Sequence, residues 1–341
     1  MQVAKLQVFY HIVRLFSLFL SPKKNKMVNR RYLRTKVMQA LFAHSVNEKE
    51  NLIGGEKKLT DSIRQCYTLF LYFISIFPEL KRYRLNKFEE VRGKINPTKE
   101  DLDPNTKFVD NLIIAQIEDN VHLGVKWNEH KISWTNQNDF IIQIYHEVAK
   151  LEEFEAYMND PQRSYAEDKK LILTIIEKIF VESQLLHWFF EEKYVHWFDD
   201  YNEALLILYK NITNFKESKG NNNSILPLFK DDEDAAFYME LYRKTILHDK
   251  EYFALIEGKL HNWEAERLMS LDVILMKMSI CELTEFPTIP IKVIINEYIE
   301  LAKTYSSAKS GLFINGVLDK VTIELKETGK LYKYGRGLID N

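Results

Sequence analysis

The sequence contains few residues that cross-link chains or interrupt helices. Its 341 residues include only 2 cysteines, 11 glycines and 8 prolines. Two cysteines cannot form a disulfide framework, and both Cys66 and Cys281 lie in apolar, helix-like stretches, which indicates reduced, buried thiols in a cytoplasmic protein. Because glycine and proline are scarce while Leu, Ile, Lys and Glu are plentiful, we expect long helices and an all-α fold.

The chain also lacks an excess of charge of one sign. Its formal net charge is -2 at pH 7, so no overall positive field would attract nucleic acid. Any contact with RNA or DNA must therefore come from a local basic cluster.

Motifs of enzymatic chemistry are missing as well. There is no phosphate-binding glycine loop, no metal-ligand cluster and no nucleophile motif, so we expect neither an enzyme nor a bound cofactor or metal. His187 and His196 are separated across an expected helix break, and His146 has no second histidine at the zincin spacing.

Residues 1–26 hold an apolar segment from Leu6 to Leu20. His11 and Arg14 interrupt it, the small-residue cleavage pattern of a signal peptide is missing, and the segment is too short to span a bilayer. We therefore expect a non-structural extension, with Met27 as the biological start.

A basic cluster opens the first expected helix, which Asn29 can cap. The cations in its first two turns are Arg30, Arg31, Arg34 and Lys36. They oppose the helix macrodipole at a cost of about a few tenths of a kcal/mol each, so helix stability does not explain them. Contact with RNA phosphates would explain these cations, because an arginine side chain can donate two parallel hydrogen bonds to one phosphate. The alternative is a solvated basic terminus.

The rest of the chain has a helical pattern on both sides of a polar stretch, Ser218–Ser224, which we expect to be a linker. Within the first block, Pro78 is expected to separate a helix at Leu59–Phe77 from one at Glu79–Arg92. The expected parts are the extension (1–26), an N-terminal helical subdomain that includes the basic helix (27–217), the linker (218–227), a C-terminal helical domain (228–328) and a tail (329–341).

The last expected helix begins near Ser310. Its apolar stripe consists of Ile314, Val317, Leu318, Val321 and Leu325. Gly316 lies inside this pattern, where glycine costs about 1 kcal/mol relative to alanine, and this predicts that another backbone packs against the helix there. Phe313 lies off the stripe.

Several successive motifs resemble those of the NusB family of bacterial transcription antitermination factors. They are Trp263-Glu-Ala-Glu-Arg267, Asp272-Val-Ile-Leu275, Glu282-Leu283, Ile289–Glu297, Glu300–Lys303 and Phe313–Lys320. The basic helix is similar to the arginine-rich first helix of that family. The resemblance covers residues 28–46 and 232–326, so much of the region between them is a helical insertion to which it assigns no role.

The resemblance implies an all-helical protein of two packed subdomains that binds the boxA element of ribosomal RNA leader transcripts together with ribosomal protein NusE. Such a factor acts in an RNA polymerase antitermination complex. The residues expected to bind RNA are Arg30, Arg31, Arg34, Lys36, Lys309 and Phe313, where Phe313 would stack on an unpaired base. Phe42 and Asp272 resemble the surface that binds the protein partner.

Two alternatives differ in function. One is a helical protein-interaction scaffold of the same fold that does not bind RNA. The other is an RNA cytosine methyltransferase, because such enzymes can carry a similar helical domain, but they need a nucleotide-cofactor domain. The chain shows no glycine-rich strand-to-helix turn that would open one.

Overall fold

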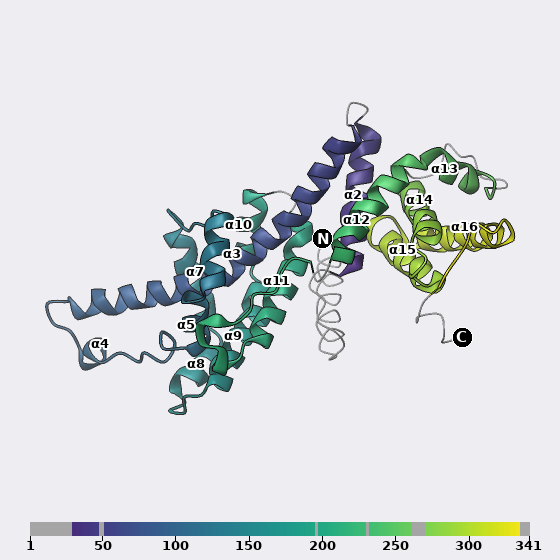
Figure 1. Cartoon of the computed structure of the whole chain (residues 1–341). Helices are drawn as coiled ribbons and strands as arrows, with labels where there is room; N and C mark the ends of the chain where they lie inside the picture. Colours follow the sequence, from purple (N-terminus) through teal and green to yellow (C-terminus); the bar gives the residue numbers. More distant parts are fainter. Residues whose placement is uncertain (1–28, 48–50, 195–196, 230–231, 261–269, 335–341) are drawn as a thin grey trace. The chain divides into compact units, whose positions relative to one another are not determined.

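The protein is seen in a computed structural model that describes residues 29–47, 51–194, 197–229, 232–260 and 270–334 (Figure 1). Every regular element in these ranges is a helix, and no strand occurs in them, which confirms the all-α expectation. Within the described residues, no helix combines the length and the hydropathy that a membrane span requires.

The chain divides into two compact units. The first, here called the insert unit, comprises Arg64–Leu228; the second, called the composite unit, comprises Val28–Ile63 together with Phe229–Asn341. Residues 1–28, which hold the expected extension, lie outside the described residues. The division differs from the expected one in the place of the basic first helix, which belongs with the C-terminal helices.

The composite unit contains seven helices or parts of helices in its described residues, and α3 continues from it into the insert unit. They are α2 (Arg30–Val46), the first turns of α3 (Leu52–Arg92), α12 (Asp232–Leu247), α13 (Asp249–Glu257), α14 (Ser270–Glu285), α15 (Ile291–Tyr305) and α16 (Ala308–Glu327).

Helix α14 is the centre of the composite unit and packs against α2, α12, α13, α15 and α16. Its residues are buried around the whole circumference, because the consecutive residues Met278–Leu283, which make more than one helical turn, are all buried. A helix that is buried on all sides needs partners on all sides. Helix α2 is one of them, because its stripe of Leu33, Val37 and Leu41 is at most 6% exposed.

Helix α16 begins at the N-cap Ser307, whose side chain accepts a hydrogen bond from the Ser310 amide. The expected stripe is confirmed, since all five of its residues are at most 5% exposed. The expectation for Gly316 is wrong. That glycine is exposed, and a Cβ built on it would meet no atom within 4 Å. The close approach occurs at Gly311, where a Cβ would lie 3.4 Å from Lys303 Cγ and 3.6 Å from Ile299 Cγ2 of α15.

The insert unit contains the remaining turns of α3 and the elements that follow it. They are α4 (Lys99–Leu102), α5 (Leu112–Glu118), α6 (Val121–Glu129), α7 (Asn138–Ala149), α8 (Glu152–Asn159), α9 (Tyr165–Ile175), the π-helix η1 (Ile176–Phe180), α10 (Gln184–Lys193), α11 (Trp197–Asn214) and the 3-10 helix η2 (Glu217–Asn222).

Pro78 does not end a helix, contrary to expectation, because α3 continues through it. An internal proline removes one backbone hydrogen bond and costs about 3 kcal/mol. The helix persists because its apolar side chains on both sides of the proline, including Phe77 and Leu80, are fully buried. Phe77 stacks on Phe180 at a centroid distance of 5.3 Å in the aromatic core of the insert unit.

The polar stretch expected to be a linker is an ordered turn of the insert unit. Asn223 is 2% exposed. Its carboxamide accepts a hydrogen bond from the Lys216 amide at 2.8 Å and donates one to the Gly220 carbonyl at 2.9 Å. The division between the units follows at Leu228.

Candidate nucleic-acid interface

The start of α2 carries the basic cluster, and a local signal determines where this helix begins. The Asn29 side chain accepts a hydrogen bond from the Tyr32 amide at 2.8 Å, which satisfies one of the free amides at the helix N-terminus. No acidic residue lies in the first turn of α2. The carboxylates that balance its arginines come from α12, α14 and α15.

Arg34 points into the protein rather than to the surface. Its side chain is 3% exposed, and it donates to both carboxylate oxygens of the fully buried Glu282 on α14, at 2.7 Å and 2.8 Å. The Tyr298 hydroxyl of α15 donates to the same carboxylate at 2.6 Å. Burial alone would lower the pKa of Arg34, but the charge and hydrogen bonds of Glu282 raise it above its ordinary value. Arg34 thus fastens α2 to α14.

Lys36 is also inside the protein, at 2% exposed, with its ammonium 5.5 Å from the centroid of the Tyr32 ring. A buried cation cannot reach an RNA phosphate in this conformation. The expectation that Arg34 and Lys36 contact RNA is therefore corrected, since both residues are at most 3% exposed and Arg34 pairs with Glu282 of α14.

Arg30 and Arg31 remain at the surface, each oriented by carboxylates. Arg30 pairs with Glu233 at 2.9 Å and Asp234 at 3.0 Å on α12, and its side chain is 22% exposed. Arg31 pairs with both oxygens of Glu297 on α15 at 2.7 Å and 2.9 Å, and its side chain is 46% exposed. These five residues are here called the arginine surface.

The Arg31–Glu297 pair is a preoriented donor group. Burial would raise the pKa of Glu297, but hydrogen bonds from Arg31 and the positive charges of Arg31 and Arg34 lower it below its usual value. The carboxylate is thus ionised and holds the guanidinium in place. A guanidinium has five N–H donors, of which Glu297 takes two, so the others can bind an incoming phosphate without breaking the pair.

Lys309 and Phe313 are one turn apart on α16, so they lie on the same side of that helix. Lys309 is exposed and Phe313 is half-buried. Helix α16 comes close to α15 at Lys303, whose side chain lies beside Gly311. Glu297 lies six residues earlier on α15, at a distance of about 9 Å along the helix axis. The structure thus presents Lys309 and Phe313 on a helix next to the one that carries Glu297 of the arginine surface.

The two residues expected at a partner surface differ in exposure. Phe42 on α2 is 41% exposed. Asp272, in the first turn of α14, is 5% exposed, and its Oδ1 has no hydrogen-bond donor among the described residues. An unpaired buried carboxylate oxygen costs about 1–3 kcal/mol or more. Residues 261–269, which hold the Trp263–Arg267 motif, lie outside the described residues.

Sequence reasoning missed the carboxylates of the interface. Glu282 and Glu297 lie within the motifs quoted above, but nothing in the sequence shows that they face α2. Glu233 and Asp234 lie in the first turn of α12, where acidic residues are common because they stabilise the helix dipole, so they do not stand out in the sequence. The one signal that could have found them is the uncompensated basic first turn of α2, because a buried arginine there requires an acidic partner elsewhere.

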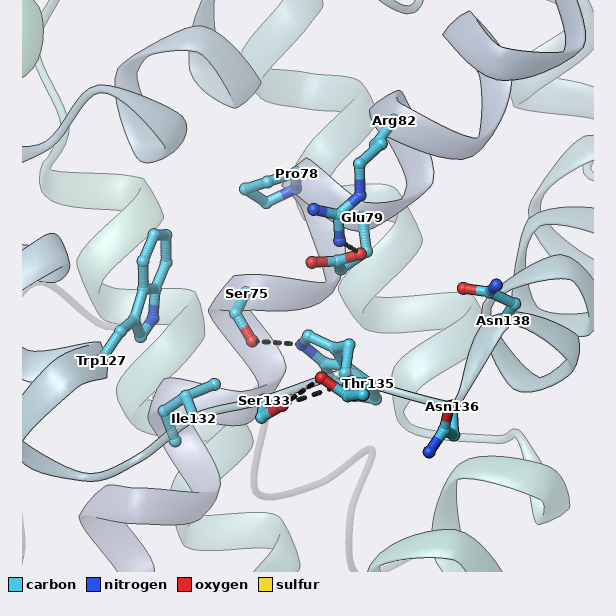
Figure 2. A pocket seen from close by; sticks show the side chains of 11 residues that line it. Ser75, Pro78, Glu79, Arg82, Trp127, Ile132, Ser133, Thr135, Asn136 and Asn138 are labelled. Atoms are coloured by element: carbon cyan, nitrogen blue, oxygen red, sulfur yellow. Dashed lines mark hydrogen bonds and ion pairs between the residues drawn. The ribbon is translucent and has the colours of Figure 1, made fainter.

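The insert unit holds a separate pocket of about 520 Å³ beside Pro78 (Figure 2). Trp134 is fixed in it by a hydrogen bond from its indole nitrogen to Ser75 Oγ at 2.9 Å, and Arg82 forms an ion pair with Glu79 at its edge. No group of histidine, cysteine or acidic side chains within the described ranges could hold a metal ion. His187 packs on Tyr201, and His196 lies outside those ranges.

The fold and this surface define a class, namely all-helical proteins whose basic first helix is fastened by ion pairs to a helical bundle. The chain belongs to the NusB family. Over 114 residues it is 40% identical to the transcription antitermination protein NusB of Salinibacter ruber, covering 33% of this chain and 71% of that protein. The NusB family model matches residues 202–322.

Two other relatives with the same name give similar values. The NusB of Listeria welshimeri is 38% identical over 106 residues, which covers 31% of this chain and 81% of that protein. The NusB of Chloroherpeton thalassium is 39% identical over 104 residues, covering 30% of this chain and 49% of that protein. No solved structure matches the chain. The matched segments are about a third of the chain, which is consistent with an enlarged region outside them.

Proposed function

We propose that the protein is a transcription antitermination factor that binds boxA-type leader RNA together with ribosomal protein NusE, as part of an RNA polymerase antitermination complex. It acts by binding rather than by catalysis. Family membership supports the role, and the arginine surface is the observation that carries the RNA-binding part, because it presents Arg30 and Arg31 at the start of α2 with fixed orientation.

The RNA contacts fall on two helices. Arg30 and Arg31 bind phosphates through the N–H groups that their carboxylates leave available. Lys309 on α16 adds a further cation, and Phe313 offers an aromatic face for an unpaired base. Arg34 and Lys36 support this surface from inside, since Arg34 holds α2 against α14.

NusE binds at the other end of the composite unit in this proposal. The exposed ring of Phe42 supplies apolar contact area, and Asp272 Oδ1, which has no donor among the described residues, is the proposed acceptor for a hydrogen bond from the partner. A donor from the partner would remove the cost of the unpaired oxygen, so replacing Asp272 by alanine should weaken association with NusE without weakening RNA binding.

Charge reversal tests the RNA role. We expect Arg30→Glu/Arg31→Glu to weaken binding of a boxA-type RNA oligonucleotide and to reduce the slope of log K against log salt by about 0.7 for each lost phosphate contact. Lys170→Glu/Lys219→Glu is the matched control, since both lysines are exposed in the insert unit. Equal affinity and slope for the two double variants would reject this surface, provided that circular dichroism shows the same helicity.

A scaffold that binds proteins but not RNA is the second candidate, and the charge balance of the interface favours it. The three arginines Arg30, Arg31 and Arg34 pair with four carboxylates, those of Glu233, Asp234, Glu282 and Glu297, so these ion pairs carry a formal charge of -1. A pull-down with NusE, with and without boxA RNA, separates the candidates. Association with NusE that RNA does not strengthen supports the scaffold.

A further inference from the structure

The chain does not end at the last helix, because an ordered segment follows it. Helix α16 stops at Glu327, and Gly329 takes φ +68, a left-handed conformation suited to glycine after a helix. The Lys330 amide donates to the Leu325 carbonyl at 2.9 Å, which closes the helix end. The chain then continues as a non-helical segment, Lys330–Tyr334, here called the C-terminal strap.

Hydrogen bonds hold the strap against the composite unit. The Lys333 ammonium donates to the carbonyls of Glu282 and Phe286, both at 2.9 Å, at the C-terminal end of α14. Each carbonyl also accepts one backbone hydrogen bond, from the Phe286 and Ile289 amides respectively, so Lys333 uses the second lone pair of each oxygen, and the negative end of the helix dipole favours a cation there. The Tyr334 amide donates to the Pro287 carbonyl at 3.1 Å. Lys330 pairs with Glu251 at 2.9 Å.

Exposure alternates along the strap from residue to residue. Leu331 and Lys333 are half-buried, whereas Tyr332 is 71% exposed and Tyr334 is 52% exposed. The two tyrosine rings lie 5.8 Å apart between centroids, with an interplanar angle of 51°. The strap thus holds a pair of aromatic faces in solvent on a fixed backbone.

A short series of contacts connects the strap to the arginine surface. Phe286, whose carbonyl binds Lys333, packs its ring against Phe237 at 5.2 Å. The Arg30 guanidinium lies 5.0 Å from the centroid of the same Phe237 ring. Glu282, the other carbonyl that Lys333 binds, pairs through its side chain with Arg34. The anchor of the strap and the start of α2 therefore meet at the same end of α14.

The geometry points to Tyr332 and Tyr334 as a stacking platform for unpaired bases of the RNA whose phosphates contact Arg30 and Arg31. Single-stranded RNA presents phosphates and base faces along one chain, and proteins bind it by combining cations with exposed aromatic rings. This inference rests on the proposed function, and it adds base contacts from a segment outside the six residues expected to bind RNA.

The test compares paired variants of the full-length chain. We expect Tyr332→Ala/Tyr334→Ala to weaken binding of a boxA-type RNA oligonucleotide about 5-fold to 150-fold for each base that is stacked. The salt slope should not change, because no phosphate contact is lost. Tyr332→Phe/Tyr334→Phe keeps the rings and should bind like the wild type. Trp188→Ala/Phe198→Ala is the matched control, since both side chains are 66% exposed in the insert unit.

A second readout uses 2-aminopurine placed at successive positions of the oligonucleotide. Stacking on tyrosine should quench its fluorescence in the wild type and in the phenylalanine variant, but not in the alanine variant. Wild-type affinity in the alanine variant, or weakened affinity in the phenylalanine variant, would overturn the platform. If instead the wild type binds no RNA, the proposed function falls, and the two failures are thereby distinguished.

Discussion

Removing one partner of the Arg34–Glu282 pair should destabilise the composite unit severely. In Arg34→Met the hydrogen bond from the Tyr298 hydroxyl at 2.6 Å is the one that remains to the buried Glu282 carboxylate among the described residues. Breaking a buried ion pair in this way costs about 3–5 kcal/mol, because one charge stays buried without its counter-ion. We therefore expect a loss of that size in the free energy of unfolding of this unit.

The double variant Arg34→Met/Glu282→Gln should recover most of the loss. It buries neither charge, and the glutamine oxygen can still accept from Tyr298. We expect it to lie within about 1–2 kcal/mol of the wild type, since replacing both partners of a buried pair is often close to neutral. The control Arg31→Met removes a surface pair and should cost at most about 1 kcal/mol.

Hydrogen exchange of the α14 amides is the appropriate assay. A chain with two units need not unfold in one transition, so a single melting temperature would mix them. The slowest amides of a buried central helix report opening of the composite unit alone. A loss below about 1 kcal/mol in Arg34→Met, or a double variant as unstable as Arg34→Met, would refute the view that Arg34 is a structural residue.

Three further outcomes are expected. Gly316→Ala should stabilise α16 by about 0.5–1 kcal/mol in urea unfolding, because the position is helical and open. Gly55→Ala should destabilise by about 1–3 kcal/mol, because its Cβ would lie 1.9 Å from the Tyr242 hydroxyl. The Glu297 pKa is lowered from 4.5, so stability from its pair with Arg31 should be full above pH 4.5 and should decline as the pH falls below that value.

Each of these outcomes has a contradicting result. Destabilisation by Gly316→Ala would restore the idea that a backbone packs against that glycine. An unchanged Gly55→Ala variant would show that the Tyr242 ring moves aside freely. Arg31→Met should reduce the loss of unfolding free energy at acid pH. A pH dependence identical to that of the wild type would mean that Arg31 does not lower the pKa of Glu297.

The sequence predicts the apolar stripes well and the pairings between helices poorly. The five stripe residues of α16 recur at helical spacing, which is a local property that a single segment displays. The partner of Arg34 is Glu282, which is 248 positions away, and no local pattern connects them. The sequence could therefore predict that α2 is basic, but not that one of its arginines is buried.

The predictions for Gly316 and Pro78 are wrong because they also rest on local sequence alone. The local preferences of glycine and proline are readable, but tertiary packing decides what they do. Gly316 and Gly311 both fall in the α16 segment, and only the position of α15 makes Gly311 the close contact. Pro78 has the preference of a helix stop, and burial of its neighbours overrides that preference.

The discontinuous composite unit has a consequence for synthesis on the ribosome. Its first segment ends at Ile63, and its second begins at Phe229. At about 5–20 residues per second, translation of the intervening residues takes on the order of 10 to 30 s. During that time α2 has neither α12 nor α14 to cover its apolar stripe. Early folding of the insert unit would bring the two segments together and lower the entropic cost of joining them, which for an unfolded loop of this length is about 4–5 kcal/mol.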